Sequence, residues 1–272
     1  MTRFSFKKAI LFLSIATMIV PYALNAASLH VPSVGMNTIA EAMLKTRAGD
    51  TIVLEKGTYR ERVLLAPGVT LISRTPFAAV VDGTGKGVVI TMGKNSTIEG
   101  LVVRNGTIGV FSNSPGNKIV SCRIIKNWQT GIIAVRHLPI IEDNVIAFNR
   151  GSGFQGWDVR STSATINHNT ISYNGNHGIA VGGASEFIVE NNVVAYNERF
   201  GMKVLSEAEK VQVTNNNFYH NLNNMLKKLP SGNFSFDPAF VAPRTGMNFS
   251  TDPAKCCKAK GTDDQELGTR IR

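Results

Sequence analysis

Residues 141–149 read Ile-Glu-Asp-Asn-Val-Ile-Ala-Phe-Asn, and residues 189–197 read Val-Glu-Asn-Asn-Val-Val-Ala-Tyr-Asn. The two stretches share their apolar positions, a central asparagine and a final asparagine. The final asparagine belongs to a column that recurs every 22 to 25 residues, at Asn105, Asn127, Asn149, Asn174, Asn197 and Asn221. A repeat of this length is typical of solenoid proteins, in which each repeat forms one coil.

Other residues keep a fixed distance from these asparagines. A second asparagine lies five positions earlier, at Asn144, Asn169, Asn192 and Asn216, and Cys122 takes that position in an earlier unit. A glycine lies four positions after each of the first five asparagines, at Gly109, Gly131, Gly153, Gly178 and Gly201. Each unit therefore predicts three short β-strands separated by turns at Asn or Gly, residues that tolerate left-handed backbone.

Strands of a few residues cannot bury their own apolar side chains, so the coils must stack on one another. Stacking places equivalent residues about 4.8 Å apart, the spacing between strands. The second asparagine column then predicts an internal amide ladder, in which Cys122 is a small buried residue and not a reactive thiol. We therefore predict an all-β fold, a single right-handed parallel β-helix over residues 51–221.

The sequence on either side of residues 51–221 lacks the repeat. Residues 28–50 predict an N-terminal cap with one short amphipathic helix over residues 37–47, which ends before Gly49. A cap is expected because the end of a solenoid exposes unpaired strand edges. Residues 222–272 predict an irregular C-terminal tail, and no second domain is expected.

The N-terminus has the pattern of a secretory signal over residues 1–27. Arg3, Lys7 and Lys8 precede an apolar run at 9–20, and small residues follow at 23–27. The run holds 12 residues, too few for a membrane span of about 20. A buried N-terminal helix is the alternative interpretation. We expect an exported protein, periplasmic or extracellular, without a membrane span.

The formal net charge is +10, and removal of the three basic signal residues leaves 10 − 3 = +7. A basic surface favours anionic partners. Export makes nucleic acid the least expected of these, so we predict an acidic polysaccharide or oligosaccharide as partner, no nucleic acid, and a monomer. The redox state of the adjacent Cys256 and Cys257 stays open, because neighbouring cysteines rarely pair with each other.

The chain resembles the pectin-lyase-like right-handed parallel β-helix superfamily. Residues 49–61, Gly-Asp-Thr-Ile-Val-Leu-Glu-Lys-Gly-Thr-Tyr-Arg-Glu, are similar to the opening of such proteins, and the two quoted units are similar to their repeat. Residues 237–241 and 261–268 are similar to how many bacterial members end. The resemblance implies the β-helix fold. It also implies a choice among polysaccharide lyases, uronate epimerases, glycoside hydrolases, tailspikes and non-catalytic periplasmic proteins.

Lyases of this superfamily often hold calcium with clustered carboxylates, and its inverting hydrolases use paired aspartates. Only Asp158 lies near a strand that follows the glycine column in the clear repeats. One carboxylate does not supply the six to eight oxygens that Ca²⁺ prefers. We therefore predict no metal site and no cofactor, with Ca²⁺ as the ion that the resemblance would allow.

Alternation along the strands after the glycines predicts an outward column of Phe111, Ile133, Gln155, Ala180 and Lys203. The longest gap between a column glycine and the next coil follows Gly153, and insertions in solenoids cluster where they bind. That gap and the neighbouring turns carry aromatic and charged residues. We predict that substrate is bound by Gln155, Trp157, Asp158, Arg160, Arg136 and Trp128.

Arginine pairs bidentately with a uronate carboxylate, and tryptophan offers a flat apolar face to a pyranose ring. In β-elimination or C5 epimerisation a base removes the proton next to that carboxylate while cations stabilise the developing charge. Lys203 or His177 is the predicted base, and Arg199 or Arg160 the neutralising cation. The alternative is a non-catalytic carbohydrate-binding or surface-structural protein, in which Lys203 is a solvated edge charge and His177 a surface donor.

Overall fold

The computed structural model describes residues 26–159, 164–182, 187–205, 211–225, 230–251 and 267–269. Arg160 and nearly all of the predicted signal segment lie outside these residues, as do Cys256 and Cys257. Within the described residues, no helix has the length and apolar character needed to cross a bilayer.

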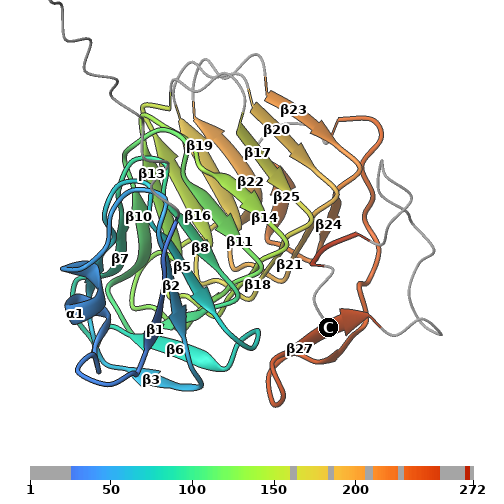
Figure 1. Ribbon diagram of the computed structural model, residues 1–272. Coiled ribbons are helices and arrows are strands. Elements are labelled where there is room, and N and C mark those ends of the chain that lie inside the picture. The colour runs from blue at the N-terminus through green and yellow to red at the C-terminus, as the bar shows by residue number, and fades with distance from the viewer. Residues whose placement is uncertain are drawn as a thin grey trace, which may run out of the picture.

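The chain winds into a parallel β-helix whose wall consists of three sheets (Figure 1). The first sheet contains β1 (Ser28–Val31), β2 (Thr51–Leu54), β5 (Thr70–Ser73), β8 (Thr97–Glu99), β11 (Lys118–Val120), β14 (Ile140–Glu142), β17 (Ala164–Asn167), β20 (Phe187–Glu190) and β23 (Val211–Thr214). The second contains β3 (Gly57–Tyr59), β6 (Ala79–Asp82), β9 (Val102–Arg104), β12 (Arg123–Ile125), β15 (Val145–Ala147), β18 (Thr170–Ser172), β21 (Val193–Ala195) and β24 (Asn217–Tyr219). The third contains β4 (Val63–Leu64), β7 (Val88–Met92), β10 (Ile108–Ser112), β13 (Ile132–Val135), β16 (Phe154–Trp157), β19 (Ile179–Gly182), β22 (Phe200–Leu205) and β25 (Asn223–Met225).

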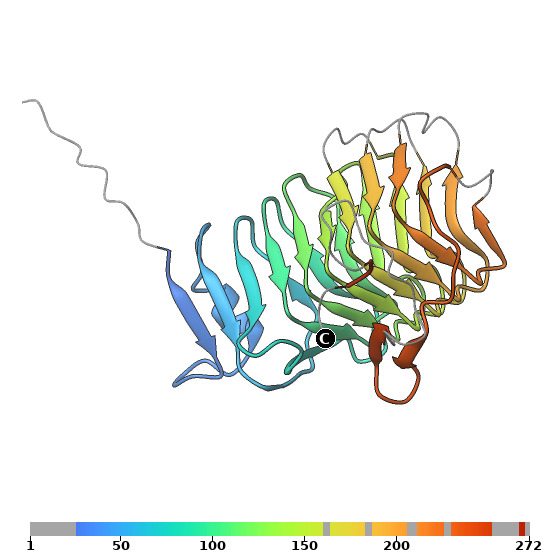
Figure 2. The same cartoon turned by 90° about the vertical axis from the view of Figure 1, so that its right-hand side faces the viewer.

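Each strand pairs with the equivalent strand one coil away, so the coils lie one behind another along a single axis (Figure 2). Inward side chains from all three sheets form one continuous core. Its centre includes Ile119 from the first sheet, Ile146 from the second and Phe154 from the third, each fully buried. The predicted right-handed parallel β-helix is confirmed.

Two columns of asparagine run through the interior of the coils. In the predicted ladder, each Nδ2 donates to the Oδ1 of the next coil, from Asn144 to Asn169 (2.9 Å), Asn192 (3.0 Å), Asn216 (2.8 Å) and Asn233 (3.0 Å). The repeat-defining asparagines form a second ladder that we did not predict, from Asn127 to Asn149 (2.9 Å), Asn174 (3.0 Å), Asn197 (2.9 Å) and Asn221 (2.9 Å). Since side-chain amides both donate and accept, each ladder satisfies its own polar groups away from water.

The column glycines allow the second ladder to approach the third sheet. A Cβ atom at Gly153 would lie 2.8 Å from the carbonyl oxygen of Gly178 and 3.0 Å from Nδ2 of Asn174. At Gly178 the corresponding distances to Gly201 and Asn197 are 2.7 and 2.9 Å. These contacts leave no room for a side chain, which explains why the glycine recurs in every coil.

The N-terminal region differs in part from the prediction. The helix α1 (Ile39–Met43) is shorter than the expected 37–47, although it begins with a capping box in which Thr38 and Glu41 bond each other's backbone N–H. Strand β1 precedes it and pairs with β2. The first strand of the solenoid therefore lies inside the segment 28–50 that we expected to form only a cap, because its backbone groups can pair with those of β2. The capping role of α1 stays a prediction.

The C-terminal tail is more regular than its sequence indicates. Strand β25 adds to the third sheet, and Asn233 extends the first ladder. Further on, β26 (Phe240–Ala242) and β27 (Asn248–Thr251) form an antiparallel pair, and residues 267–269 bond the second sheet at Asn191 and Thr170. The irregular tail predicted over 222–272 is thus wrong for these segments, because backbone pairing and aromatic packing replace the lost repeat.

Replacing Asn169 by alanine is expected to lower the free energy of unfolding by about 2–4 kcal/mol, since neighbouring buried amide groups lose their partners. Asn169 accepts from the backbone N–H of Asn144 at 2.9 Å and donates to the carbonyl of Ile141 at 2.8 Å, besides its two ladder bonds. Urea unfolding followed by circular dichroism measures the change. Asn113→Ala is the matched control, because Asn113 is exposed. Equal losses in the two variants would contradict the structural role of the ladder.

Candidate functional site

The third sheet presents the outward column that the sequence predicts. Strand register aligns Phe111 with Ile133, Gln155, Ala180 and Lys203 in successive coils. Their neighbours Val110, Ile132, Phe154, Ile179 and Met202 point inward and are fully buried. Because side chains alternate along a strand, the column must face outward. We call this outer face of the third sheet, with the turns that lead into it from the second sheet, the wall.

Gln155 occupies the centre of the wall in a fixed orientation. Its Oε1 accepts a hydrogen bond from the Thr130 hydroxyl at 3.1 Å, and its Nε2 donates to the Ser152 hydroxyl at 3.2 Å. Both partners come from the turns just before the glycine column. The amide is therefore held by the two turns beside it, which leaves its remaining donor and acceptor capacity for a ligand.

His177, Arg199, Phe200 and Lys203 form one cluster where the turn meets β22. The rings of His177 and Phe200 lie 5.5 Å apart, and Lys203 Nζ lies 5.9 Å from the centre of the Phe200 ring. His177 is 7% exposed, whereas Arg199 is exposed and Lys203 half-buried. The structure thus brings together the three residues that we predicted to be catalytic.

The hydrogen bonding of His177 decides what it can do. Its Nδ1 accepts the backbone N–H of Phe200 at 3.3 Å, so in the neutral ring the proton sits on Nε2. Burial lowers the pKa of His177, and the nearby charges of Lys203 and Arg199 lower it further. A buried, neutral imidazole of this tautomer offers an N–H donor. To act as a base it would first have to give up its contact with Phe200.

The two tryptophans lie at opposite ends of their strands and both are exposed, Trp128 by 49% and Trp157 by 44%. The guanidinium of Arg150 lies 3.9 Å from the centre of the Trp128 ring, a cation–π contact between successive coils. The sequence placed Arg150 in this turn but gave it no role. Its position beside Trp128 follows from the coil spacing, since Arg150 lies 22 residues after it.

Arg136 and Asp158 meet at the far end of the wall, where Nε of Arg136 lies 3.9 Å from Oδ2 of Asp158. Both side chains are largely exposed, so this ion pair contributes little stability. Trp157 aligns with Val135 in the adjacent strand and points the same way as Gln155. The predicted binding residues Gln155, Trp157, Asp158 and Arg136 therefore share one region. Arg160 lies outside the described residues.

Metal ligands do not gather on the wall. Within the described residues, no three His, Cys, Asp or Glu side chains lie close enough together to hold a metal ion. Cys122 is fully buried at the start of the first ladder, and burial raises the pKa of its thiol to about 12. It therefore stays protonated and takes the filler role that its column predicts.

The architecture defines a right-handed parallel β-helix protein. Solved structures with this fold are similar to the chain, although none shares more than a fifth of its residues. They include the A-module of a mannuronan C-5 epimerase from Azotobacter vinelandii, with 18% identity, a TM-score of 0.52, and coverage of 68% of this chain and 67% of the other. A pectate lyase has 14% identity, a TM-score of 0.52 and coverage of 80% and 84%. An alginate lyase from a Paenibacillus species has 15% identity, a TM-score of 0.51 and coverage of 77% and 95%.

The family is narrower than the fold. A family described as "periplasmic copper-binding protein (NosD)" matches residues 48–235, well over half of the chain, and the chain therefore belongs to this family. No curated protein sequence matches the chain. The likeness to the epimerase and the lyases rests on the shared β-helix.

Replacing Lys203 by methionine is expected to raise the pKa of His177, because one of the charges that lower it is removed. In the wild type the unfolded chain takes up this proton first, at its ordinary pKa of about 6.5. The stability that depends on neutral His177 is therefore complete above about pH 6.5 and falls as the pH drops toward the lowered folded value. The variant should lose less.

Titration of the His177 ring protons by NMR measures this pKa directly. Lys126→Met is the control, because Lys126 is an exposed lysine that does not contribute to the His177 shift. An unchanged His177 titration in Lys203→Met would show that the two groups are not electrostatically coupled.

Proposed function

We propose that this protein binds an acidic polysaccharide along the wall. The observation that carries the proposal is the cluster of Arg199, Lys203 and neutral His177 beside exposed aromatic rings. Within the described residues, neither Arg199 nor Lys203 forms an ion pair. Two cations with no carboxylate partner there suit the carboxylates of a uronate chain, and the His177 Nε2–H suits a sugar hydroxyl or carboxylate oxygen.

The remaining wall residues fit the neutral parts of such a chain. Trp157 offers an exposed ring for stacking against a pyranose. Gln155, fixed by Thr130 and Ser152, supplies an amide for hydroxyl groups. Successive coils repeat every 4.8 Å or so, which lets one extended sugar chain contact several coils. The β-helix enzymes named above act on such chains, which supports the substrate class.

Catalysis is the second candidate function, as a lyase or C5-epimerase. Either reaction needs a base for the proton next to the carboxylate. The Phe200 N–H engages Nδ1 of His177, which favours His177 as a donor and leaves Lys203 as the candidate base. Arg199, in the turn before β22, is the residue that would stabilise the developing negative charge. The same cluster therefore serves binding in both functions.

The description of the family also raises copper. Copper sites in proteins are built from imidazole, thiolate and thioether groups. The described residues contain no group of three potential ligands, and the one described cysteine is a buried thiol in the core. These residues do not fit a copper centre, and we derive no copper step from them. The periplasm, named in the same description, agrees with the predicted signal segment, and we propose it as the location.

Binding to polygalacturonate and to alginate, with dextran as a neutral comparison, tests the function by affinity electrophoresis in low salt. The wild type should be retarded by both acidic polymers. The double variant Arg199→Ala/Lys203→Ala should bind about tenfold or more weakly, as expected for two lost charge-assisted contacts. Lys118→Ala, an exposed lysine on the first sheet, is the control. Unchanged binding in the double variant would contradict the proposed wall.

Incubation with the same polymers separates binding from catalysis. A lyase generates unsaturated uronates with ultraviolet absorbance, and an epimerase exchanges the C5 proton with solvent deuterium. If Lys203 is the base, Lys203→Ala should abolish either signal while Arg199→Ala reduces it. Polymer binding with neither signal would leave binding as the function of the wall.

A further inference from the structure

An aromatic stack stands outside the second sheet, at the corner where the chain turns toward the wall. Phe148, Tyr173 and Tyr196 follow β15, β18 and β21, each one residue before an asparagine of the second ladder. Their rings stack almost parallel, with centres 5.2 and 5.0 Å apart. All three have left-handed backbone, with φ of 57°, 56° and 58°, a conformation that costs bulky residues about 1–2 kcal/mol each.

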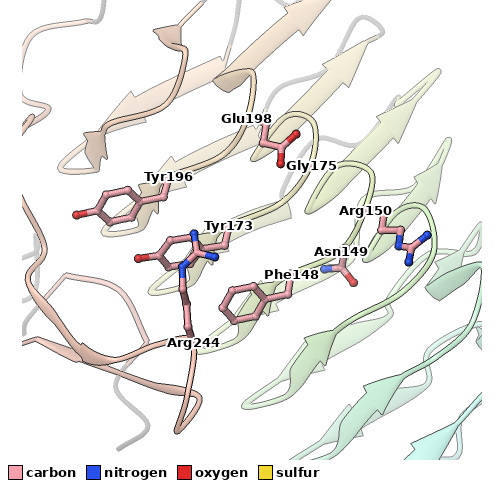
Figure 3. A pocket seen from close by; sticks show the side chains of 8 residues that line it. All are labelled: Phe148, Asn149, Arg150, Tyr173, Gly175, Tyr196, Glu198 and Arg244. Atoms are coloured by element: carbon pink, nitrogen blue, oxygen red, sulfur yellow. The ribbon is translucent and has the colours of Figure 1, made fainter.

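The C-terminal hairpin closes over this stack. Phe240 of β26 and Phe249 of β27 pack against the rings, and Phe249 is buried. The turn between the two strands brings Arg244 inward, and its guanidinium lies 4.7 Å from the centre of the Tyr173 ring (Figure 3). The hairpin therefore places one cation against the middle of the stack.

The corner turns form the opposite side. Arg150, Gly175 and Glu198 each follow a second-ladder asparagine, so they stack in a column as the rings do. A Cβ atom at Gly175 would overlap the carbonyl oxygen of Arg150. The middle position of the column must therefore stay without a side chain, which leaves a gap between Arg150 and Glu198 (Figure 3).

These groups line a cavity of about 390 Å³, within the range of small-ligand sites. Arg150, Glu198 and Arg244 are exposed, and within the described part of the chain none of the three forms an ion pair. Asn149 also lines the cavity, but its amide is engaged in the ladder. Two cations, one carboxylate and three ring edges are thus left to face a ligand.

We infer that this cavity is a subsite for a single uronate unit, an inference that rests on the proposed binding of acidic polysaccharide. The carboxylate of the sugar pairs with Arg244 or Arg150. Glu198 accepts hydrogen bonds from sugar hydroxyls, and the ring edges contact the apolar side of the pyranose. A neutral sugar lacks the carboxylate for the arginines, so the subsite selects uronates.

The subsite adjoins the wall through one contact. Arg150 lines the cavity while its guanidinium lies over Trp128, whose turn leads into β13 of the wall. An oligouronate held at one end in the cavity can therefore pass Trp128 and continue across the third sheet. The hairpin would then fix the end of the sugar chain, and the wall would bind the units that follow.

The two tryptophans of the chain make the test possible, because Trp128 adjoins the cavity and Trp157 lies on the wall. We would titrate ¹⁵N-labelled protein with galacturonate, trigalacturonate, trimannuronate and galactose, and follow the two indole N–H signals, assigned with Trp→Phe variants. A uronate in the cavity should shift the Trp128 signal through Arg150, and the trimers should shift both signals. Galactose should shift neither.

Arg244→Ala should weaken trimer binding about tenfold by calorimetry, the loss expected for one charge-assisted contact, and should remove the Trp128 shift. Arg47→Ala, an exposed arginine at the N-terminal end, is the control. If trimers bind and shift Trp157 while Arg244→Ala changes nothing, the subsite is refuted and the binding wall stands. If no acidic sugar or polymer binds at all, the proposed function fails together with it.

Discussion

The hydrogen bonds between stacked asparagine side chains are the interaction on which the rest of the structure depends. Each amide accepts from the coil before it and donates to the coil after it, so a ladder is satisfied only when successive coils align without a slip. In a parallel sheet, a slip of one residue would turn every inward side chain outward. The two ladders exclude this slip at two corners of each coil. As a result, loops of different length between the strands do not disturb the register of the sheets.

Fixed register is what turns separate residues into a surface. Gln155 and Lys203 lie 48 residues apart in the chain, yet only Ala180 separates them in the outward column. The cations of the wall are likewise gathered by stacking and not by local sequence. Burial of His177 between Phe200 and the turn then makes it responsive to both cations. The electrostatics of the wall follows from the geometry of the coil.

The sequence predicted those features that recur in every coil. The first ladder, the glycine column and the outward column of the third sheet all follow from spacing alone, because stacking converts period into contact. Features that occur once could not be found this way. The tautomer of His177 depends on a backbone N–H one coil away, and the Arg150–Trp128 contact depends on side-chain conformation. The second ladder was visible as a column, but its asparagines were assigned to turns, for which the residue is equally suited.

The C-terminal hairpin shows why the tail escaped prediction and why it matters. Its strands pair with each other instead of with a coil, so the repeat gives no signal for them. What positions the hairpin is the aromatic stack, whose rings lie outside the core and adopt strained left-handed backbone. The solenoid itself gains little from rings at these positions, since its interior is already filled. Three such residues in register are better explained by the surface that they create, a platform on which Phe240 and Phe249 pack and against which Arg244 is held. The tail thereby brings a cation to the corner that the coils alone do not supply.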